Sequence, residues 1–216
     1  MKVIVIASQK GGVGKTTLAG HLAVQAEAAG AGPVALIDTD PQGSLAAWWN
    51  EREAEAPLFA QAETDNLPAH LAELEAAGVE LVIIDTPPAV TDTIKKVLAV
   101  ADLVIIPTRP SPHDLRAVGS TVELVEAAGR RMIFVINGAA NRARIAGEAA
   151  VALSQHGTVA PVTLYQRTDY ASSMIDGRTV QEIDAAGRSA QEVGELCKYV
   201  SAQLRKSTNM EIRRAA

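Results

Sequence analysis

The stretch that most constrains the fold is Lys10-Gly11-Gly12-Val13-Gly14-Lys15-Thr16-Thr17, which follows the apolar run Val3-Ile4-Val5-Ile6. A loop that binds phosphate needs backbone N–H groups that converge on anionic oxygens, and glycines permit that close approach. It also needs a lysine for the phosphates, a hydroxyl for Mg²⁺ and a helix that begins at the loop. Gly14, Lys15 and Thr16 supply these features in order. A phosphate-binding loop is therefore favoured over a glycine-rich turn with a chance lysine.

Two details separate this loop from the general pattern G-x-x-x-x-G-K-[ST]. The first position of that pattern falls on Gln9, so the leading glycine is absent, and a second lysine, Lys10, precedes the glycines. In both respects the loop resembles the deviant Walker-A ATPases of the ParA/MinD family. In that family the first lysine reaches the phosphates in the partner subunit. The resemblance thus implies a homodimer that depends on ATP, with Lys10 at the shared site; the alternative is a solvated loop lysine.

Length and composition favour one folded α/β domain. The 216 residues are enough for a single domain with a full core, and 48% of them are hydrophobic. The net charge of −5 argues against a uniformly basic nucleic-acid binder but leaves room for a local basic patch. Cys197 is the only cysteine, which excludes an internal disulfide and favours a half-buried helix residue. Without a long apolar run, the chain is expected to be cytoplasmic and to have no membrane partner.

Apolar, β-branched runs alternate with segments of helical spacing. Near-continuous apolar strands between helices indicate a parallel sheet that is covered on both faces. We therefore predict the α/β class, with a doubly wound, mostly parallel sheet and helices on both faces, as in P-loop NTPases. The expected strands are residues 3–7, 33–37, 80–84, 102–107, 132–136 and 159–165, and the clearest helices are residues 18–29, 68–77 and 115–128.

The periphery and the C-terminus carry weaker patterns. Trp48 and Trp49 predict a short helix that packs in an outer layer, and residues 57–62 predict an edge strand. A stripe of apolar residues predicts a helix over residues 189–206. The last ten residues lack such a pattern. We therefore expect a single domain over residues 1–206 and a flexible tail over residues 207–216.

Two further predicted strands end in acidic residues. Asp38-Thr39-Asp40-Pro41-Gln42-Gly43 follows one of them, and Asp85-Thr86-Pro87-Pro88 follows another. Strands of a doubly wound sheet present their functional groups at their carboxyl ends. A carboxylate there, beside a phosphate-binding loop, holds Mg²⁺ in the Walker-B arrangement, and Asp85 fits that role. The alternative is an Asp that only caps the following turn.

Both acidic strings are hallmarks of the ParA branch, so the resemblance assigns roles to their residues. It implies that Asp40 orients the attacking water and that Asp38 is an outer partner of the Mg²⁺ and of Thr16. It also implies that Asp85, Thr86 and the two prolines sense the γ-phosphate. Lys10, Lys15 and Mg²⁺ would neutralise charge during hydrolysis. The implied enzyme is a weak, Mg²⁺-dependent ATPase that converts ATP to ADP.

Two later strings also match the family. Pro107-Thr108-Arg109-Pro110-Ser111-Pro112-His113-Asp114-Leu115 resembles its P-x-x-P-S-x-x-D-L segment. Phe134-Val135-Ile136-Asn137 resembles the strand whose terminal Asn recognises adenine, a role that suits an amide with both a donor and an acceptor. The alternative, to which we give equal weight, is that Asn137 is only a turn residue before Gly138.

The resemblance is to small ParA-type partition ATPases that have no N-terminal helix-turn-helix. It implies non-specific DNA binding by the ATP dimer, nucleoid association in that state, and release when a ParB-like or other adaptor stimulates hydrolysis. The cargo would be DNA or a protein assembly. A MinD-like membrane-cycling regulator of division is the alternative, and the tail offers it only Met210 and Ile212 as bulky apolar residues.

A basic patch on the C-terminal helix is the candidate DNA surface. Lys198 and Arg205 are seven residues apart and share one helix face, and Lys206 follows them. Arg142 and Arg144 are candidates to extend the patch. The alternative is an ordinary solvated helix face.

Overall fold

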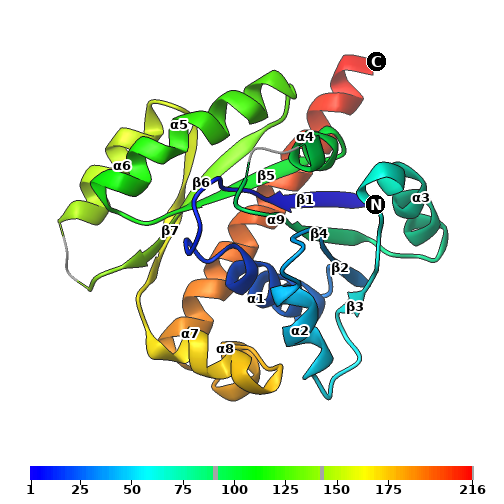
Figure 1. Ribbon diagram of the computed structural model, residues 1–216, viewed down its shortest axis with the longest axis horizontal. Helices are drawn as coiled ribbons and strands as arrows, with labels where there is room; N and C mark the ends of the chain where they lie inside the picture. Colours follow the sequence, from blue (N-terminus) through cyan, green and yellow to red (C-terminus); the bar gives the residue numbers. More distant parts are fainter. Residues whose placement is uncertain (90–91, 142–143, 216) are drawn as a thin grey trace.

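The computed structural model describes residues 1–89, 92–141 and 144–215, with side chains described as far as Lys206. Seven strands form one sheet in the order β3-β2-β4-β1-β5-β6-β7. Every strand pairing in these ranges is parallel. Helices cover both faces of the sheet (Figure 1). The predicted α/β class and doubly wound sheet are therefore confirmed.

The strands lie close to the predicted positions, because long apolar runs can be buried on both faces only inside a covered sheet. The predicted edge strand over residues 57–62 is reduced to two residues that pair with the neighbouring strand. The strands are β1 (Lys2–Ile6), β2 (Val34–Asp38), β3 (Leu58–Phe59), β4 (Leu81–Asp85), β5 (Leu103–Thr108), β6 (Met132–Ala139) and β7 (Thr158–Tyr165).

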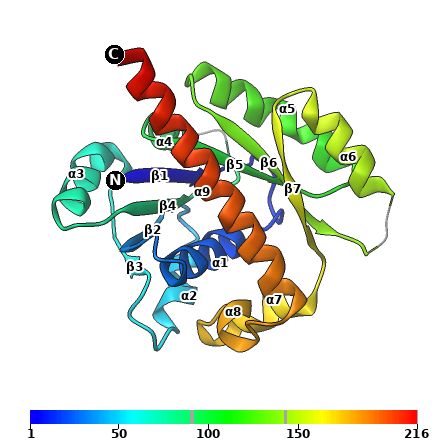
Figure 2. The ribbon, with the colours of Figure 1, turned by 180° about the vertical axis from the view of Figure 1, so that it is seen from behind.

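Two helical layers sandwich the sheet, as Figures 1 and 2 show from opposite sides. Side chains of β1 alternate between the layers, with Ile4 and Ile6 in one apolar cluster and Val3 and Val5 in the other. The first layer contains α1 (Lys15–Ala28), α2 (Ser44–Asn50) and α9 (Arg188–Ala215). The second contains α3 (Leu67–Ala76), α4 (Asp92–Ala99), α5 (Pro112–Ala127) and α6 (Ile145–Ser154). The short helices α7 (Thr168–Ser173) and α8 (Val180–Ile183) lie beside α1 and α9.

Some helices differ from the sequence prediction at their ends. Helix α1 begins at Lys15 rather than residue 18, because Gly14 adopts a left-handed conformation (φ 88°) that starts the helix inside the loop. Helix α5 begins at Pro112 rather than residue 115, because the Ser111 side chain caps the Asp114 N–H. Helix α9 continues to Ala215, over the segment predicted to lack regular structure. The good helix formers near its end, such as Glu211 and Arg213, support helix without an apolar stripe.

The strand order determines where chemistry can occur. β1 lies between β4 and β5, so the connections diverge to opposite sides at its carboxyl end. Such a switch point leaves a crevice that binds ligands in open α/β sheets. None of the helices in the described ranges combines the length and apolar character that a bilayer span requires.

Candidate functional site

The predicted phosphate-binding loop connects β1 to α1 at the switch point. Gly12 and Gly14 both adopt positive φ angles, 72° and 88°, which the loop needs to turn its N–H groups inward. Lys15 is buried at the first turn of α1. Burial lowers the pKa of Lys15, and the carboxylates of Asp85 and Asp40 oppose this shift. The loop thus has the glycine conformations that such a turn requires and a lysine that is held beside two acids.

Thr16 and Asp85 form the closest polar pair at this site. The Thr16 hydroxyl donates to Asp85 Oδ2 at 2.5 Å, although the residues are 69 positions apart. Burial raises the pKa of Asp85 to about 7; the Thr16 hydrogen bond and Lys15 lower it, and Asp38 raises it. A divalent cation would favour the charged carboxylate. The structure therefore joins the hydroxyl and the carboxylate that the sequence assigned to Mg²⁺.

The contact between Asp38 and Thr16 that the sequence led us to expect is not made. The Asp38 carboxylate instead accepts three backbone N–H groups, from Asp40 at 3.0 Å, Leu45 at 3.0 Å and Ala46 at 3.1 Å. The reason is the strand order: β4 lies between β2 and β1, so Asp85 is next to the loop and Asp38 is one strand farther away. Asp38 shapes the turn into α2, and its metal role stays a prediction.

A cavity of about 790 Å³ opens above the phosphate-binding loop. The loop residues Gly11–Thr17 form one wall except at Val13, and Asp40, Pro88 and the exposed acid Glu51 contribute to the others. Asp40 Oδ1 accepts the Gln42 N–H at 3.0 Å, which fixes the carboxylate at the cavity. The cavity can hold a chain of phosphates between a lysine and a carboxylate. The role of Asp40 in orienting water remains a prediction, which its place at this cavity supports.

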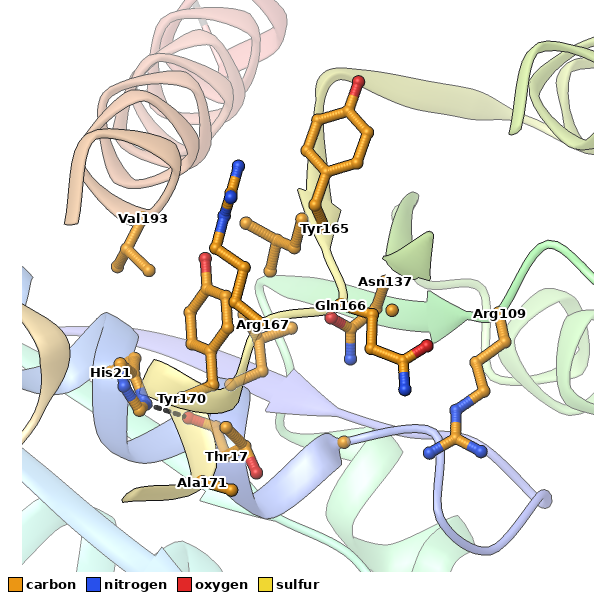
Figure 3. A pocket seen from close by; sticks show the side chains of 14 residues that line it. Thr17, His21, Arg109, Asn137, Tyr165, Gln166, Arg167, Tyr170, Ala171 and Val193 are labelled. Atoms are coloured by element: carbon orange, nitrogen blue, oxygen red, sulfur yellow. Dashed lines mark hydrogen bonds between the residues drawn. The ribbon is translucent and has the colours of Figure 1, made fainter. Parts of the chain in front are cut away.

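A second cavity, of about 170 Å³, adjoins the first and is shown in Figure 3. Its lining comes from α1, the end of β6, the segment from β7 into α7, and α9. The lining combines apolar side chains, such as Leu18, Leu164 and Val193, with the amides of Asn137 and Gln166. Apolar walls with a few polar groups suit a planar heterocyclic base.

Asn137 lies inside β6, not in a turn, so the turn interpretation is wrong. β6 continues to Ala139, and Gly138 at φ 65° forms an irregularity in its pairing with β7. The Asn137 amide donates to the Val13 carbonyl at 2.6 Å and so ties β6 to the phosphate-binding loop. An added Cβ at Gly14 would overlap this amide, so glycine is required there. Recognition of adenine by Asn137 remains a prediction that its place in the second cavity supports.

The sequence analysis missed several residues of the second cavity. His21, Gln166 and Tyr170 line it, and none carried a local signal, because their elements meet only in the folded chain. Figure 3 shows Gln166 beside Asn137. Arg109 lies in the string that resembles the family's P-x-x-P-S-x-x-D-L segment, and that resemblance implies no role for it.

His21 connects α1 to the α7–α8 layer. Its Nδ1 lies 2.8 Å from the Thr17 carbonyl, and its Nε2 lies 3.3 Å from the Val180 backbone nitrogen and 3.4 Å from Ser173 Oγ. Since the Val180 nitrogen can only donate, Nε2 must accept and Nδ1 must carry the proton. Burial lowers the pKa of His21 to about 4. A neutral imidazole therefore holds one wall of the second cavity.

Lys10 lies apart from the groups that meet in the single chain. The residue is exposed, and it is not among those that line either cavity. Its backbone N–H donates to Ser8 Oγ at 3.3 Å. This placement agrees with a lysine that acts on another molecule, and the contact with a partner's phosphates stays a prediction.

The donors at the site fit Mg²⁺ bound together with a nucleotide. In the described ranges, no three His, Cys, Asp or Glu side chains converge as a metal cage would require. Mg²⁺ in nucleotide sites uses one or two carboxylates or hydroxyls and completes its shell with phosphate oxygens and waters. Thr16 and Asp85 supply that smaller set.

The basic residues predicted on the C-terminal helix are exposed on α9. Lys198 and Arg205 line one groove of about 430 Å³ between α1 and α9, and Lys206 is exposed next to Arg205. The sequence analysis missed Arg131, which donates to the Gln203 carbonyl at 3.1 Å and so adds a cation beside α9.

The predicted extension of this patch by Arg144 is not supported. Arg144 precedes α6, which packs on the opposite face of the sheet from α9. Arg142 lies outside the described residues.

Comparisons with known proteins agree with this site. A family model, the CobQ/CobB/MinD/ParA nucleotide binding domain, matches residues 4–211. The maintenance of carboxysome distribution protein A of Halothiobacillus neapolitanus is 30% identical over 209 residues, covering 91% of this chain and 95% of that protein. Protein ParA of Rhizobium radiobacter is 30% identical over 141 residues, or 63% of each chain. In fold, a variant of Cyanothece McdA in complex with ATP matches with a TM-score of 0.77 at 20% identity, over 94% of this chain and 96% of that one.

Proposed function

Since this chain belongs to the CobQ/CobB/MinD/ParA family of nucleotide-binding domains, we propose that it is an ATPase that positions a cargo along DNA. Two copies associate when each holds ATP, and the dimer binds DNA without sequence preference. An adaptor protein on the cargo stimulates hydrolysis, after which the subunits separate and leave the DNA. The protein is then cytoplasmic, and it is associated with the nucleoid in its ATP state.

The observation that carries this proposal is the convergence of Lys15, Thr16, Asp85 and Asp40 at one edge of the sheet. Transfer of a phosphoryl group to water requires neutralised oxygens and a positioned nucleophile. Lys15 and the loop N–H groups bind the phosphates, and Asp40 orients the water. Bound Mg²⁺, held by Thr16 and Asp85, would add charge neutralisation between the β- and γ-phosphates.

For the cargo, we propose a protein assembly rather than a plasmid. The likeness to the Halothiobacillus carboxysome distribution protein covers 95% of that protein, whereas the likeness to the Rhizobium ParA covers 63%. A whole-length likeness includes the surfaces that contact partners as well as the nucleotide site. An adaptor that resembles ParB in role, though not in DNA recognition, would link the assembly to the ATPase.

The DNA surface is assigned to the α9 groove. Lys198 and Arg205 share that groove, and Arg131 and Lys206 add positive charge nearby. A few cations on one chain bind DNA weakly, but a dimer doubles them and gains avidity. This accounts for DNA binding that depends on ATP without any element that reads bases.

The test is to follow the purified protein with ATP, with ADP and without nucleotide. Light scattering reports the dimer, phosphate release reports turnover, and biolayer interferometry reports binding to duplex DNA or to anionic vesicles. We expect slow Mg²⁺-dependent turnover, and a dimer and DNA binding only with ATP. A protein that binds no nucleotide would refute the proposal. An ATP dimer that binds vesicles and not DNA would establish the MinD-like alternative instead.

A further inference from the structure

Arg109 occupies an unusual place at the nucleotide site. It follows β5, where its side chain extends between two glycines that belong to different parts of the site. A Cβ placed on Gly138 would lie 3.7 Å from Arg109 Cγ and Nε, and one placed on Gly12 would lie 4.0 Å from an Arg109 guanidinium nitrogen. The side chain thus reaches from the end of β6 to the phosphate-binding loop. Figure 3 shows it beside Asn137, with its guanidinium toward the loop that leads into α1.

The two cavities of the site meet at Arg109. Among the residues that the structure describes, three line both the larger cavity above the loop and the smaller cavity beside Asn137: Gly14, Thr17 and Arg109. Gly14 and Thr17 offer backbone groups and a hydroxyl at this junction. Arg109 is therefore the one charged side chain, within residues 1–89, 92–141 and 144–206, that the two cavities share.

The guanidinium of Arg109 has no acidic partner among the side chains that the structure describes. Within the described part of the chain it forms no hydrogen bond and no ion pair. Arg167, the other arginine at the smaller cavity, differs because Glu192 binds it at 2.6 Å. A guanidinium offers five donors in a planar fork that matches phosphate oxygens. Arg109 is thus a potential anion-binding group that no described residue of the chain pairs with.

We propose that Arg109 binds the nucleotide of its own subunit, by donating to oxygens of the α-phosphate. The inference rests on the proposed nucleotide-binding function. A nucleotide with its terminal phosphates in the larger cavity and its base in the smaller one has its α-phosphate at the junction. Arg109 and Thr17 then hold this phosphate from two places in the fold, the segment after β5 and helix α1.

The test is to titrate ADP with Mg²⁺ into wild-type, Arg109→Ala and Arg109→Lys proteins by calorimetry, and to repeat the titration with ATP. A charge-assisted hydrogen bond predicts an ADP dissociation constant about tenfold or more higher in Arg109→Ala. Since ADP and ATP share the α-phosphate, the same factor should apply to ATP. Arg109→Lys should lose less, because it keeps the charge but not the fork. Arg116→Ala, an exposed arginine on α5 that lines neither cavity, is the matched control and should bind like wild type.

The outcomes separate this inference from the proposed function. Wild-type ADP affinity in Arg109→Ala would overturn the role of Arg109 alone. Weaker ATP binding with normal ADP binding would also overturn it, since the residue would then act on a γ-phosphate or across a dimer. If the wild-type protein bound neither nucleotide, the proposed function would fail together with the inference. The melting temperature without nucleotide should be equal in all variants, because the Arg109 side chain is exposed and unpaired.

Discussion

Asp40 is the residue at which hydrolysis can be separated from binding. Its Oδ1 accepts the Gln42 N–H, and within the described part of the chain Oδ2 accepts no hydrogen bond. Asp40→Ala should keep ATP binding, because the loop, Lys15 and the Thr16–Asp85 pair remain. Turnover should fall by about 100-fold or more, the usual loss for a group that orients or deprotonates the nucleophile. Phosphate release measures turnover, and calorimetry measures ATP affinity.

Glu51→Ala is the matched control for this prediction. Glu51 is an exposed acid that lines the same cavity. Its removal therefore tests whether hydrolysis depends on Asp40 in particular or on any negative charge near the cavity. We expect it to hydrolyse ATP at the wild-type rate. Wild-type turnover in Asp40→Ala would instead move the role to another residue, with Asp38 as the next candidate.

His21 makes the stability of the fold depend on pH. Its pKa is about 4 when folded, against 6.5 as the ordinary value. Between these values the unfolded chain binds more protons, so the His21 contribution is complete above pH 6.5 and is lost as pH falls toward 4. At pH 5 this loss is about 2 kcal/mol. Asp85, with its pKa raised to about 7, has the opposite effect, since its folded form binds the proton more readily.

The comparison of wild type with His21→Gln isolates the histidine from Asp85. Urea unfolding followed by the fluorescence of Trp48 and Trp49 gives the free energy at pH 7.5 and pH 5. The stability advantage of wild type over the variant should shrink by about 2 kcal/mol at the lower pH. Glu182 and the Tyr170 ring face His21. Both are the same in the two proteins, so their own contributions to the pH dependence cancel in the comparison. An advantage that does not change with pH would mean that His21 is not buried in its neutral form.

The sequence could predict the role of a residue only where that role did not depend on contacts with distant parts of the chain. The meeting of Lys15, Thr16 and Asp85 could be expected because each follows the carboxyl end of a central strand. The partners of Asp38 could not, because they depend on whether β2 or β4 is next to β1. Arg109 and His21 were missed for a similar reason. Their cavities form between segments far apart in the chain.

At the scale of elements, α9 carries the prediction about DNA. Lys198→Glu/Arg205→Glu should weaken duplex binding and reduce its dependence on salt. Two residues on each of two subunits give up to four phosphate contacts, so the slope of log K against log salt should fall by about 3 to 4. The measurement is interferometry with ATP across a series of salt concentrations. Both proteins also carry Asp40→Ala, which should keep the ATP dimer from dissociating through hydrolysis.

The control for α9 must change charge equally on another surface. Arg116→Glu/Arg144→Glu does so on α5 and at the start of α6, which pack on the opposite face of the sheet. This control should bind DNA like its parent, apart from the general effect of net charge. Equal losses in both double variants would indicate long-range charge alone. Unchanged binding in the α9 variant would place the DNA surface elsewhere.

Two of the helices that the sequence did not predict, α7 and α8, share one physical cause. Helices α7 and α8 are too short to show a period of 3.6 residues. Contacts across the chain hold them instead, such as those of Arg52, which donates to the Gly177 carbonyl at 2.5 Å and pairs with Glu182 at 2.8 Å. A capping box of Thr179 and Glu182 then begins α8. Long apolar strands, by contrast, were predicted well because their pattern is local.

At the scale of the whole molecule, the carboxyl edge of the sheet leaves Lys10 apart from the other groups of the site. The cavity above the loop is open, and Lys10 is exposed outside it. The remaining groups of the site come from the carboxyl ends of β1, β2 and β4 and already meet without Lys10. We therefore expect the lysine to contribute to association more than to nucleotide binding.

Lys10→Ala should stay monomeric with ATP while it still binds nucleotide through Lys15. In a two-fold dimer each Lys10 would contact the phosphates of the other subunit, so the substitution removes two charge-assisted contacts at once. At about 1.5–3 kcal/mol for each, the dimer dissociation constant should rise by roughly 100-fold or more. Light scattering with ATP measures association, and calorimetry with ADP measures binding. Lys95→Ala, an exposed lysine on α4, should dimerise normally. If Lys10→Ala formed the ATP dimer as well as wild type does, the hypothesis of a shared site would be wrong. Lys10 is the described residue to which that hypothesis gives the contact with the partner's phosphates.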